Sequence, residues 1–148
     1  MKHILVLFCS VMFAISCKSA EFQKNPPFEV IEASYNNWAG GQPGVSGINV
    51  RIHYRTAKQV TFDSIYFQSK KGIIDSYNEE GKTFIIGRIN NPRTKIVAPD
   101  GVTKQENPEA TIPFKLADDE AVLVYTYNTT TYFYKISKIE KTDDKFFQ

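Results

Sequence analysis

Cysteine and histidine are scarce in this sequence, which excludes several kinds of site. Of 148 residues, two are cysteine (Cys9 and Cys17) and two are histidine. His53 is the one histidine beyond the first few residues, and it stands between Arg51 and Arg55 on the polar side of an alternating segment. Zinc sites built from Cys and His are excluded by count, and a His-dependent triad would rest on His53 alone. We therefore expect no metal site and no cofactor, and interpret His53 as a surface residue.

The sequence also lacks an amphipathic helix after Cys17 and a surplus of charge of either sign. Its 18 basic and 16 acidic residues give a formal net charge of +2. A nearly neutral chain offers no electrostatic basis for binding nucleic acid. We expect no nucleic-acid partner.

The N-terminus has the pattern of an export signal. Lys2 and His3 precede an apolar run, Ile4 to Ile15, that only Cys9 and Ser10 interrupt. As a helix this run would span roughly 18 Å, whereas a bilayer crossing needs about 20 residues. A basic flank, a short apolar run and small residues after it predict a secretory signal peptide, residues 1–16. The alternative is an N-terminal segment buried in the core.

The run ends in Ala14-Ile15-Ser16-Cys17, which resembles the lipobox of bacterial lipoproteins. Ser16 and Cys17 match that pattern well, and Ala14 and Ile15 match it loosely. The resemblance implies cleavage before Cys17 and acylation of its thiol, with palmitate as a usual acyl group. The alternative is ordinary signal-peptidase cleavage after Ser16. Cleavage leaves Cys17 as the single cysteine, and an unpaired thiol in an exported protein is anomalous unless it is used.

These features predict four segments along the chain. They are the signal peptide (1–16), a lipidated Cys17 with a tether to Pro27 (17–27), one β domain (28–141) and a flexible tail (142–148). Pro26-Pro27 favours an extended tether that holds the domain off the membrane. Lys18 replaces the aspartate that retains lipoproteins in the inner membrane of two-membrane bacteria. We expect an exported protein anchored in the cell envelope, at the outer membrane.

Short runs with turn residues every 8–12 positions follow Pro27, and they predict an all-β fold. Ile48 to Arg55 alternates strictly between apolar and polar residues, as a half-buried strand does. This pattern favours an antiparallel β-sandwich of immunoglobulin-like architecture with about 7–9 strands. The expected strands are 28–35, 48–55, 60–68, 73–77, 82–89, 95–98, 110–116, 121–127 and 132–139.

Two connections carry specific expectations. Asn36 to Gly47 holds four glycines, so we expect irregular backbone with at least one glycine at positive φ. Asn128 to Thr131 lacks the glycine that tight hairpin turns favour, so a four-residue loop is expected. The predicted cross-strand pairs are Tyr127–Tyr132, Tyr125–Tyr134 and Leu123–Ile136, with Leu123 and Ile136 buried, Tyr125 and Tyr134 mostly buried, and Tyr127 and Tyr132 partly exposed.

Aromatic side chains near predicted loops are the candidate ligand-binding residues, because exposed Tyr and Trp can stack on sugars or anchor a partner. The candidates are Tyr35, Trp38, Tyr127 and Tyr132. The alternative is that these rings belong to the core, with Trp38 closing one end of it. The Gly40–Gly47 spacing fits no phosphate-binding motif.

Carboxylates are the remaining candidates for chemistry. Asp118, Asp119 and Glu120 are consistent with a calcium loop or an acidic turn. No pair among the 16 acidic residues can be singled out as a catalytic pair. We expect no catalytic residues.

Several segments look like those of small uncharacterised lipoproteins of Bacteroidetes-type bacteria. They are Trp38-Ala39-Gly40-Gly41, Gly47-Ile48-Asn49-Val50, Phe62 to Phe67, Glu120-Ala121-Val122 and Tyr132 to Ile136. This resemblance implies a lipoprotein and no activity. The sequence predicts a non-enzymatic envelope lipoprotein that is anchored to the membrane through Cys17 and binds an envelope protein or a glycan. The alternative is a carboxylate-dependent envelope hydrolase.

Overall fold

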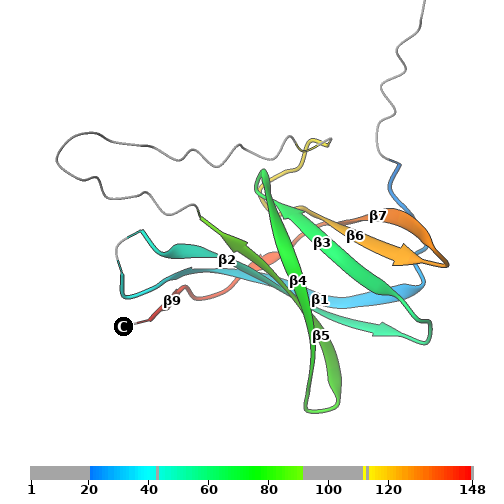
Figure 1. Cartoon of the computed structure of the whole chain (residues 1–148), viewed down its shortest axis with the longest axis horizontal. Helices are drawn as coiled ribbons and strands as arrows, with labels where there is room; N and C mark the ends of the chain where they lie inside the picture. Colours follow the sequence, from blue (N-terminus) through cyan, green and yellow to red (C-terminus); the bar gives the residue numbers. More distant parts are fainter. Residues whose placement is uncertain (1–20, 43, 92–111, 113, 148) are drawn as a thin grey trace, which may run out of the picture.

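A computed structural model describes residues 21–42, 44–91, 112 and 114–147, and these residues form nine strands and no helix (Figure 1). No helix long and apolar enough to cross a membrane occurs in this part of the chain. The predicted signal peptide, Cys17 and the expected strand 95–98 lie outside it, as do residues 110, 111 and 113 of the expected strand 110–116, and the described residues of that segment are not in a strand. The strands are β1 (Phe28–Ala39), β2 (Ser46–Thr56), β3 (Thr61–Phe67), β4 (Lys70–Glu79), β5 (Lys82–Asn90), β6 (Ala121–Tyr127), β7 (Thr130–Ile136), β8 (Glu140–Lys141) and β9 (Lys145–Phe146).

All nine strands belong to one mixed sheet with the order β7-β6-β3-β4-β5-β2-β1-β8, and β9 also pairs with β1. The pairings among β1 to β7 are antiparallel, whereas β8 and β9 run parallel to β1. The predicted all-β fold is confirmed. The finer prediction of an immunoglobulin-like sandwich is not confirmed, because the ladders form one sheet instead of two.

The sheet curls, so that its two ends share a single core. Phe28 on β1 lies edge-on to Tyr125 of β6 and Tyr134 of β7, with ring centroids 5.0 and 5.5 Å apart. Four strands separate β1 from β6 in the sheet order, so only a curled sheet can bring these rings together. The concave face is apolar, and its fully buried aliphatic residues include Val50, Ile52, Ile65, Ile85 and Leu123.

The strand boundaries differ from the predicted ones at two glycine-containing segments. Strand β1 extends to Ala39, and β2 begins at Ser46. The irregular connection between them is therefore shorter than the predicted 36–47. Gly44 has a φ of 78°, which confirms the predicted positive φ. The second turn falls at Gln68–Ser69, both at positive φ. Lys70-Lys71-Gly72, which lies between the expected strands 60–68 and 73–77, belongs to β4.

The β6–β7 hairpin has a tighter turn than the sequence suggests. Tyr127 pairs with Thr130, so the loop is Asn128–Thr129, and both residues have positive φ, 48° and 64°. The predicted four-residue loop and its pairs are therefore wrong. The observed pairs are Tyr125–Tyr132, Leu123–Tyr134 and Ala121–Ile136.

The face assignment of this hairpin survives the corrected register, because a shift of two residues keeps every side chain on its face. Leu123 and Ile136 are buried as predicted, at 0% and 5% exposure, and Tyr125 is buried at 1%. Tyr134, Tyr127 and Tyr132 are half-buried against the same core. The expectations of a mostly buried Tyr134 and of partly exposed Tyr127 and Tyr132 are confirmed.

Both termini of the described chain pair with edges of the sheet. Gln23 donates its backbone N–H to the Phe133 carbonyl at 2.7 Å, and Phe22 bridges Phe133 in parallel. These two residues fall within the predicted tether. The tail that was predicted to be flexible holds β9, and Phe147 donates its N–H to the Ala39 carbonyl at 2.9 Å.

Thr129 makes the hairpin turn a place where stability can be gained. A β-branched residue at positive φ is strained, whereas glycine adopts this conformation without steric cost. We expect Thr129→Gly to raise the free energy of unfolding by about 0.5–1 kcal/mol, measured by urea denaturation. The control Thr130→Gly, in the first residue of β7, should destabilise the protein. A lower urea midpoint for Thr129→Gly would contradict the turn geometry.

Candidate functional site

Tyr35 and Trp38 do not form a common surface. They stand three residues apart in β1, in a part of the strand that pairs with β2 without a register shift. Because side chains alternate between the two faces along a strand, Tyr35 and Trp38 point to opposite faces of the sheet. Tyr35 faces the core, with its ring centroid 4.8 Å from that of Phe67. Trp38 is on the convex face, where it lies over Gly47. It therefore does not close an end of the core, as one interpretation of the sequence suggested.

Gly47 and Asp144 fix the surroundings of Trp38. A Cβ atom at Gly47 would lie 2.7 Å from the indole Nε1 of Trp38 and 2.4 Å from the Ile89 carbonyl, so only glycine fits beneath the ring. Asp144 accepts hydrogen bonds from the backbone and side-chain N–H groups of Asn37 at 3.0 and 3.2 Å. The backbone donor foremost, then the side-chain donor and nearby Lys141, lower the pKa of the Asp144 carboxyl. A small hollow of about 240 Å³ lies between these groups and Phe146.

Tyr127 and Tyr132 lie at the opposite sheet edge from Trp38. Tyr132 stacks on Tyr125 with ring centroids 5.6 Å apart. Burial raises the pKa of the Tyr125 hydroxyl, and the neighbouring Tyr132 adds to the shift. The structure therefore places Tyr35, Tyr127 and Tyr132 against one core and Trp38 elsewhere. It does not bring the four predicted aromatics into one site.

The predicted polar candidates have structural partners. His53 lies on the convex face, with its ring centroid 4.9 Å from that of Phe84. The Arg51 guanidinium lies 3.9 Å over the same Phe84 ring and pairs with Glu79. Across the described residues, no group of three or more His, Cys, Asp or Glu side chains is placed to hold a metal ion.

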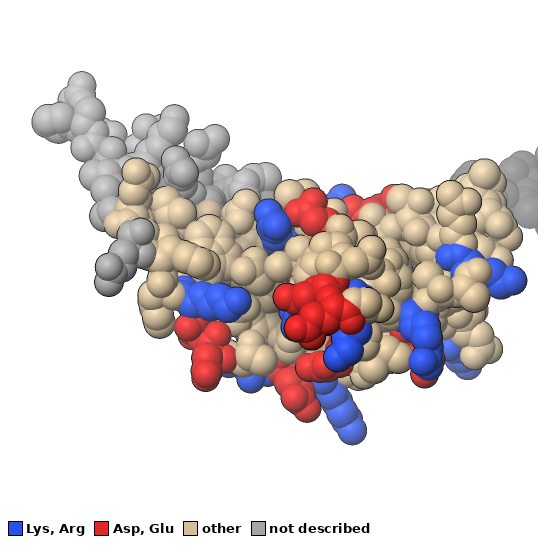
Figure 2. Space-filling view, turned by 90° about the horizontal axis from the view of Figure 1, so that it is seen from below, with Lys and Arg blue, Asp and Glu red and all other residues tan. Residues whose placement is uncertain are grey.

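Charges of both signs alternate on the convex face of β2, β5 and β4. Figure 2, which views the molecule from the side of the β4–β5 turn, shows acidic and basic side chains interspersed. Two further arginines on this face form ion pairs in addition to Arg51. Arg55 pairs with Glu29 at 2.6 Å, and Arg88 pairs with Asp75 at 3.4 Å. Such exposed pairs stabilise little, but they neutralise the arginines that could otherwise attract an anion.

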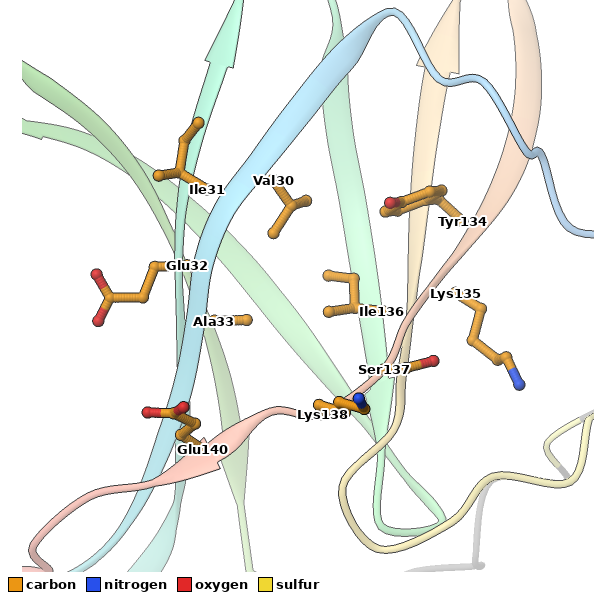
Figure 3. Close-up of a pocket in the computed structure, with 10 residues that line it drawn as sticks. All are labelled: Val30, Ile31, Glu32, Ala33, Tyr134, Lys135, Ile136, Ser137, Lys138 and Glu140. Atoms are coloured by element: carbon orange, nitrogen blue, oxygen red, sulfur yellow. The ribbon is translucent and has the colours of Figure 1, made fainter.

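A groove lies between the two ends of the curled sheet, and we call it the β1–β7 groove. It has a volume of about 550 Å³, within the range of ligand sites. Val30 and Ala33 of β1 face Tyr134 and Ile136 of β7 across it (Figure 3). Its other lining residues are Ile31, Glu32, Lys135, Ser137, Lys138 and Glu140.

The walls of the groove are strand edges with few partners. Further along β1, Tyr35 accepts a hydrogen bond from the Thr142 N–H at 2.8 Å, and Ala39 accepts one from Phe147. On its outer side, β1 from Phe28 to Ala33 pairs with no strand of the described chain. On β7, the described N-terminal segment bridges only at Phe133. The groove therefore presents backbone donors and acceptors above an apolar floor.

The β1 wall is widened by a bulge. Val30 opposes Tyr54 and Glu32 opposes His53, so Ile31 is the extra residue. Its side chain is 46% exposed, at the rim of the groove. A bulge twists an edge and re-aims side chains, which here leaves an aliphatic side chain open to a ligand.

Four ionised residues line the groove, two glutamates and two lysines. The carboxylates of Glu32 and Glu140 point away from its floor (Figure 3). Lys135 is bound at 2.8 Å by Glu120. This hydrogen bond, foremost, and the Ala117 N–H lower the pKa of the Glu120 carboxyl. Glu120 is thus the ion-pair partner of Lys135.

Sequence reasoning missed the groove because its walls are more than a hundred residues apart. Nothing in the pattern of β1 or β7 marks the outer edge as open. One local signal was available: Ile31 breaks the alternation of apolar and polar residues between Val30 and Ala33, which is what a bulged residue does.

Searches of protein-family models, curated proteins and solved structures found no match to this chain.

The Glu120–Lys135 pair should make stability depend on acid pH. The folded-state pKa of Glu120 lies below its ordinary 4.5, so the pair stabilises the fold above pH 4.5, and this contribution disappears as pH falls through the lowered pKa. We expect Glu120→Gln to have a lower urea midpoint than the unaltered protein at pH 7 and a similar one at pH 3.

The matched control for this experiment is Glu140→Gln, an exposed glutamate with no ion pair within the described chain. It should change the midpoint little at either pH. If the urea midpoint of Glu120→Gln lies below that of the unaltered protein by the same amount at pH 7 and at pH 3, ionisation of this carboxyl does not stabilise the fold.

Proposed function

We propose that this protein is an envelope lipoprotein, held at the outer membrane by acyl chains on Cys17, whose β domain binds a partner without catalysing a reaction. The anchor is supported by the apolar run that ends at Ser16-Cys17 and by the single thiol that cleavage would leave. Two or three acyl chains anchor a protein stably, whereas one binds only marginally.

The observation that carries the binding role is the β1–β7 groove with its two strand edges. An extended polypeptide satisfies such edges through its backbone and places alternate side chains in the floor. Val30 to Ala33 is about 10 Å of strand, so the groove suits a segment of three or four residues with one apolar side chain between Val30 and Ile136. A protein partner therefore fits this site better than a glycan, which would require the predicted aromatics to lie together.

The carboxylates support binding over hydrolysis. A general acid needs a pKa raised towards neutrality. Within the part of the chain that the structure describes, two carboxyls have pKa values that depart clearly from ordinary, Glu120 and Asp144, and both are shifted downwards by hydrogen-bond donors. Each holds a strand or loop in place.

The anchor is tested by Cys17→Ala. In cells that are fed radiolabelled palmitate, the unaltered protein should be labelled and fractionate with membranes. The variant should carry no label and be either unprocessed or released, because no thiol remains to acylate. Label in the variant at the level of the unaltered protein would refute anchoring through Cys17.

The binding role is tested at the exposed bulge residue Ile31. We expect Ile31→Lys to reduce recovery of envelope proteins that cross-link to the unaltered protein, because it places a charge at the groove rim. Ile73→Lys is the matched control, since Ile73 is 64% exposed on β4, away from the groove. Equal recovery with both variants, at equal thermal stability, would exclude the groove as the binding site.

A further inference from the structure

A second group of aromatic rings covers the convex face of β3, β6 and β7. Phe114 is its centre, with ring-centroid distances of 5.6 Å to Phe22, 5.4 Å to Tyr66 and 5.7 Å to Phe133. We call these four residues the outer aromatic cluster. All four rings are half-buried, so each keeps part of its surface open.

The outer aromatic cluster stands apart from the core. Tyr66 opposes Val122 and Phe133 opposes Val124 in the ladders, so these rings flank the convex side of β6. Val122 is fully buried and Val124 is 9% exposed. The face is therefore apolar near its centre, and the rings form its surface.

Lysine side chains border the cluster. The Lys71 ammonium lies 5.7 Å from the centre of the Tyr66 ring, and the Lys135 ammonium lies 6.0 Å from that of Phe22. Lys135 also pairs with Glu120, whereas Lys71 forms no ion pair within the described residues. Tyr side chains are enriched at the headgroup level of membranes, Phe side chains occur on the lipid-facing side of interfacial segments, and lysines are attracted to anionic headgroups.

The position of Phe22 links this face to the proposed anchor. Phe22 is attached to β7 by its bridge to Phe133 and by the hydrogen bond from Gln23. Five residues of chain lead from Cys17 to Phe22, which at full extension reach at most about 18 Å. An acylated Cys17 therefore cannot hold this face far from the lipid, even though Pro26-Pro27 was expected to act as a spacer.

The opposite end of the domain lies well away. β1 runs from the side where the chain enters at residue 21 to the β1–β2 turn at the other end of the molecule (Figure 1). Phe28 and Trp38 are ten residues apart on this strand, or about 33 Å. The two ends should therefore differ strongly in their distance from the membrane.

We propose that the outer aromatic cluster lies on the headgroup layer of the membrane and sets the orientation of the domain, with the Trp38 end directed away from the lipid. This proposal rests on the proposed anchor at Cys17. The occupant of the face is the lipid surface itself. The docking leaves the β1–β7 groove at the side of the domain, because its walls are edges of the sheet.

Tryptophan fluorescence can test this orientation, since Trp38 is the only tryptophan. The mature chain from Cys17 is coupled through that thiol to maleimide lipid in phosphatidylethanolamine–phosphatidylglycerol vesicles. The vesicles contain lipids brominated near the headgroup end of their acyl chains, which quench nearby tryptophan. Two reporters, Phe133→Trp and Thr131→Trp, are each placed in a Trp38→Phe background.

Both reporters should lose about half of their fluorescence on brominated vesicles compared with unbrominated ones, as side chains at the headgroup level would. Trp38 of the otherwise unaltered chain is the internal control and should keep its fluorescence. Thr131 is exposed and on the same face of β7 as Phe133, so it reports even if Phe133→Trp does not fold. Unquenched reporters on coupled protein, or quenching of Trp38 equal to theirs, would overturn the proposal.

Because Cys17 is coupled chemically to lipid in the vesicle experiment, that experiment does not depend on acylation of Cys17 in cells. The orientation and the anchor are therefore tested separately. Quenched reporters together with no palmitate on Cys17 in cells would refute the anchor and retain the affinity of this face for lipid. Palmitate on Cys17 with unquenched reporters would refute the orientation and retain the anchor.

Discussion

The packing of Phe28 against Tyr125 and Tyr134 joins the two ends of one sheet, and the rest of the structure depends on it. Without this contact, β1 and β7 would be the remote edges of an open sheet with an uncovered apolar face. The curl needs room on the concave side. A Cβ atom at Gly87 would lie 2.4 Å from Cγ2 of Ile65, and one at Gly72 would lie 3.1 Å from it. Glycine at both positions lets Ile65 fill the inside of the bend, where it is fully buried.

The same curl explains the β1–β7 groove. Side chains close the gap between the two ends of the sheet, but hydrogen bonds do not. Open strand edges invite uncontrolled pairing, and this chain covers the second half of the β1 edge with its own short strands and bridges the β7 edge at Phe133 with its N-terminal segment. Between β8 and β9, Asp144 accepts hydrogen bonds from Asn37 of β1. This contact covers the β1 edge between the two short strands. The stretch that stays open is short and bulged at Ile31, which limits pairing to a short segment.

The sequence predicted strands better than their arrangement, and the reason is physical. Period-two alternation in Ile48 to Arg55 reports which face is buried, whereas the continuous apolar run at the start of Ala121 to Tyr127 is buried on both faces. Both segments are strands. Register and turn type depend on backbone energies that side-chain patterns do not express. Asn128–Thr129 adopts a tight turn although Thr129 is poorly suited to positive φ, because the paired strands on either side impose it. Whether strands join in one sheet or two depends on contacts such as Phe28–Tyr125, which are about a hundred residues apart in sequence.

The candidate site was less predictable than the fold, since it is made by edges and not by residue types. The aromatic rings that the sequence singled out divide between the core and the convex face, because odd and even positions of β1 point in opposite directions. Phe22 was expected only as part of the tether and Phe114 only as part of a strand, yet they cover the convex face of β6. Their importance comes from where the chain enters the domain. A tether that docks onto β7 before β1 begins fixes which face lies nearest to an anchor at Cys17, and a longer free linker would have left that choice open.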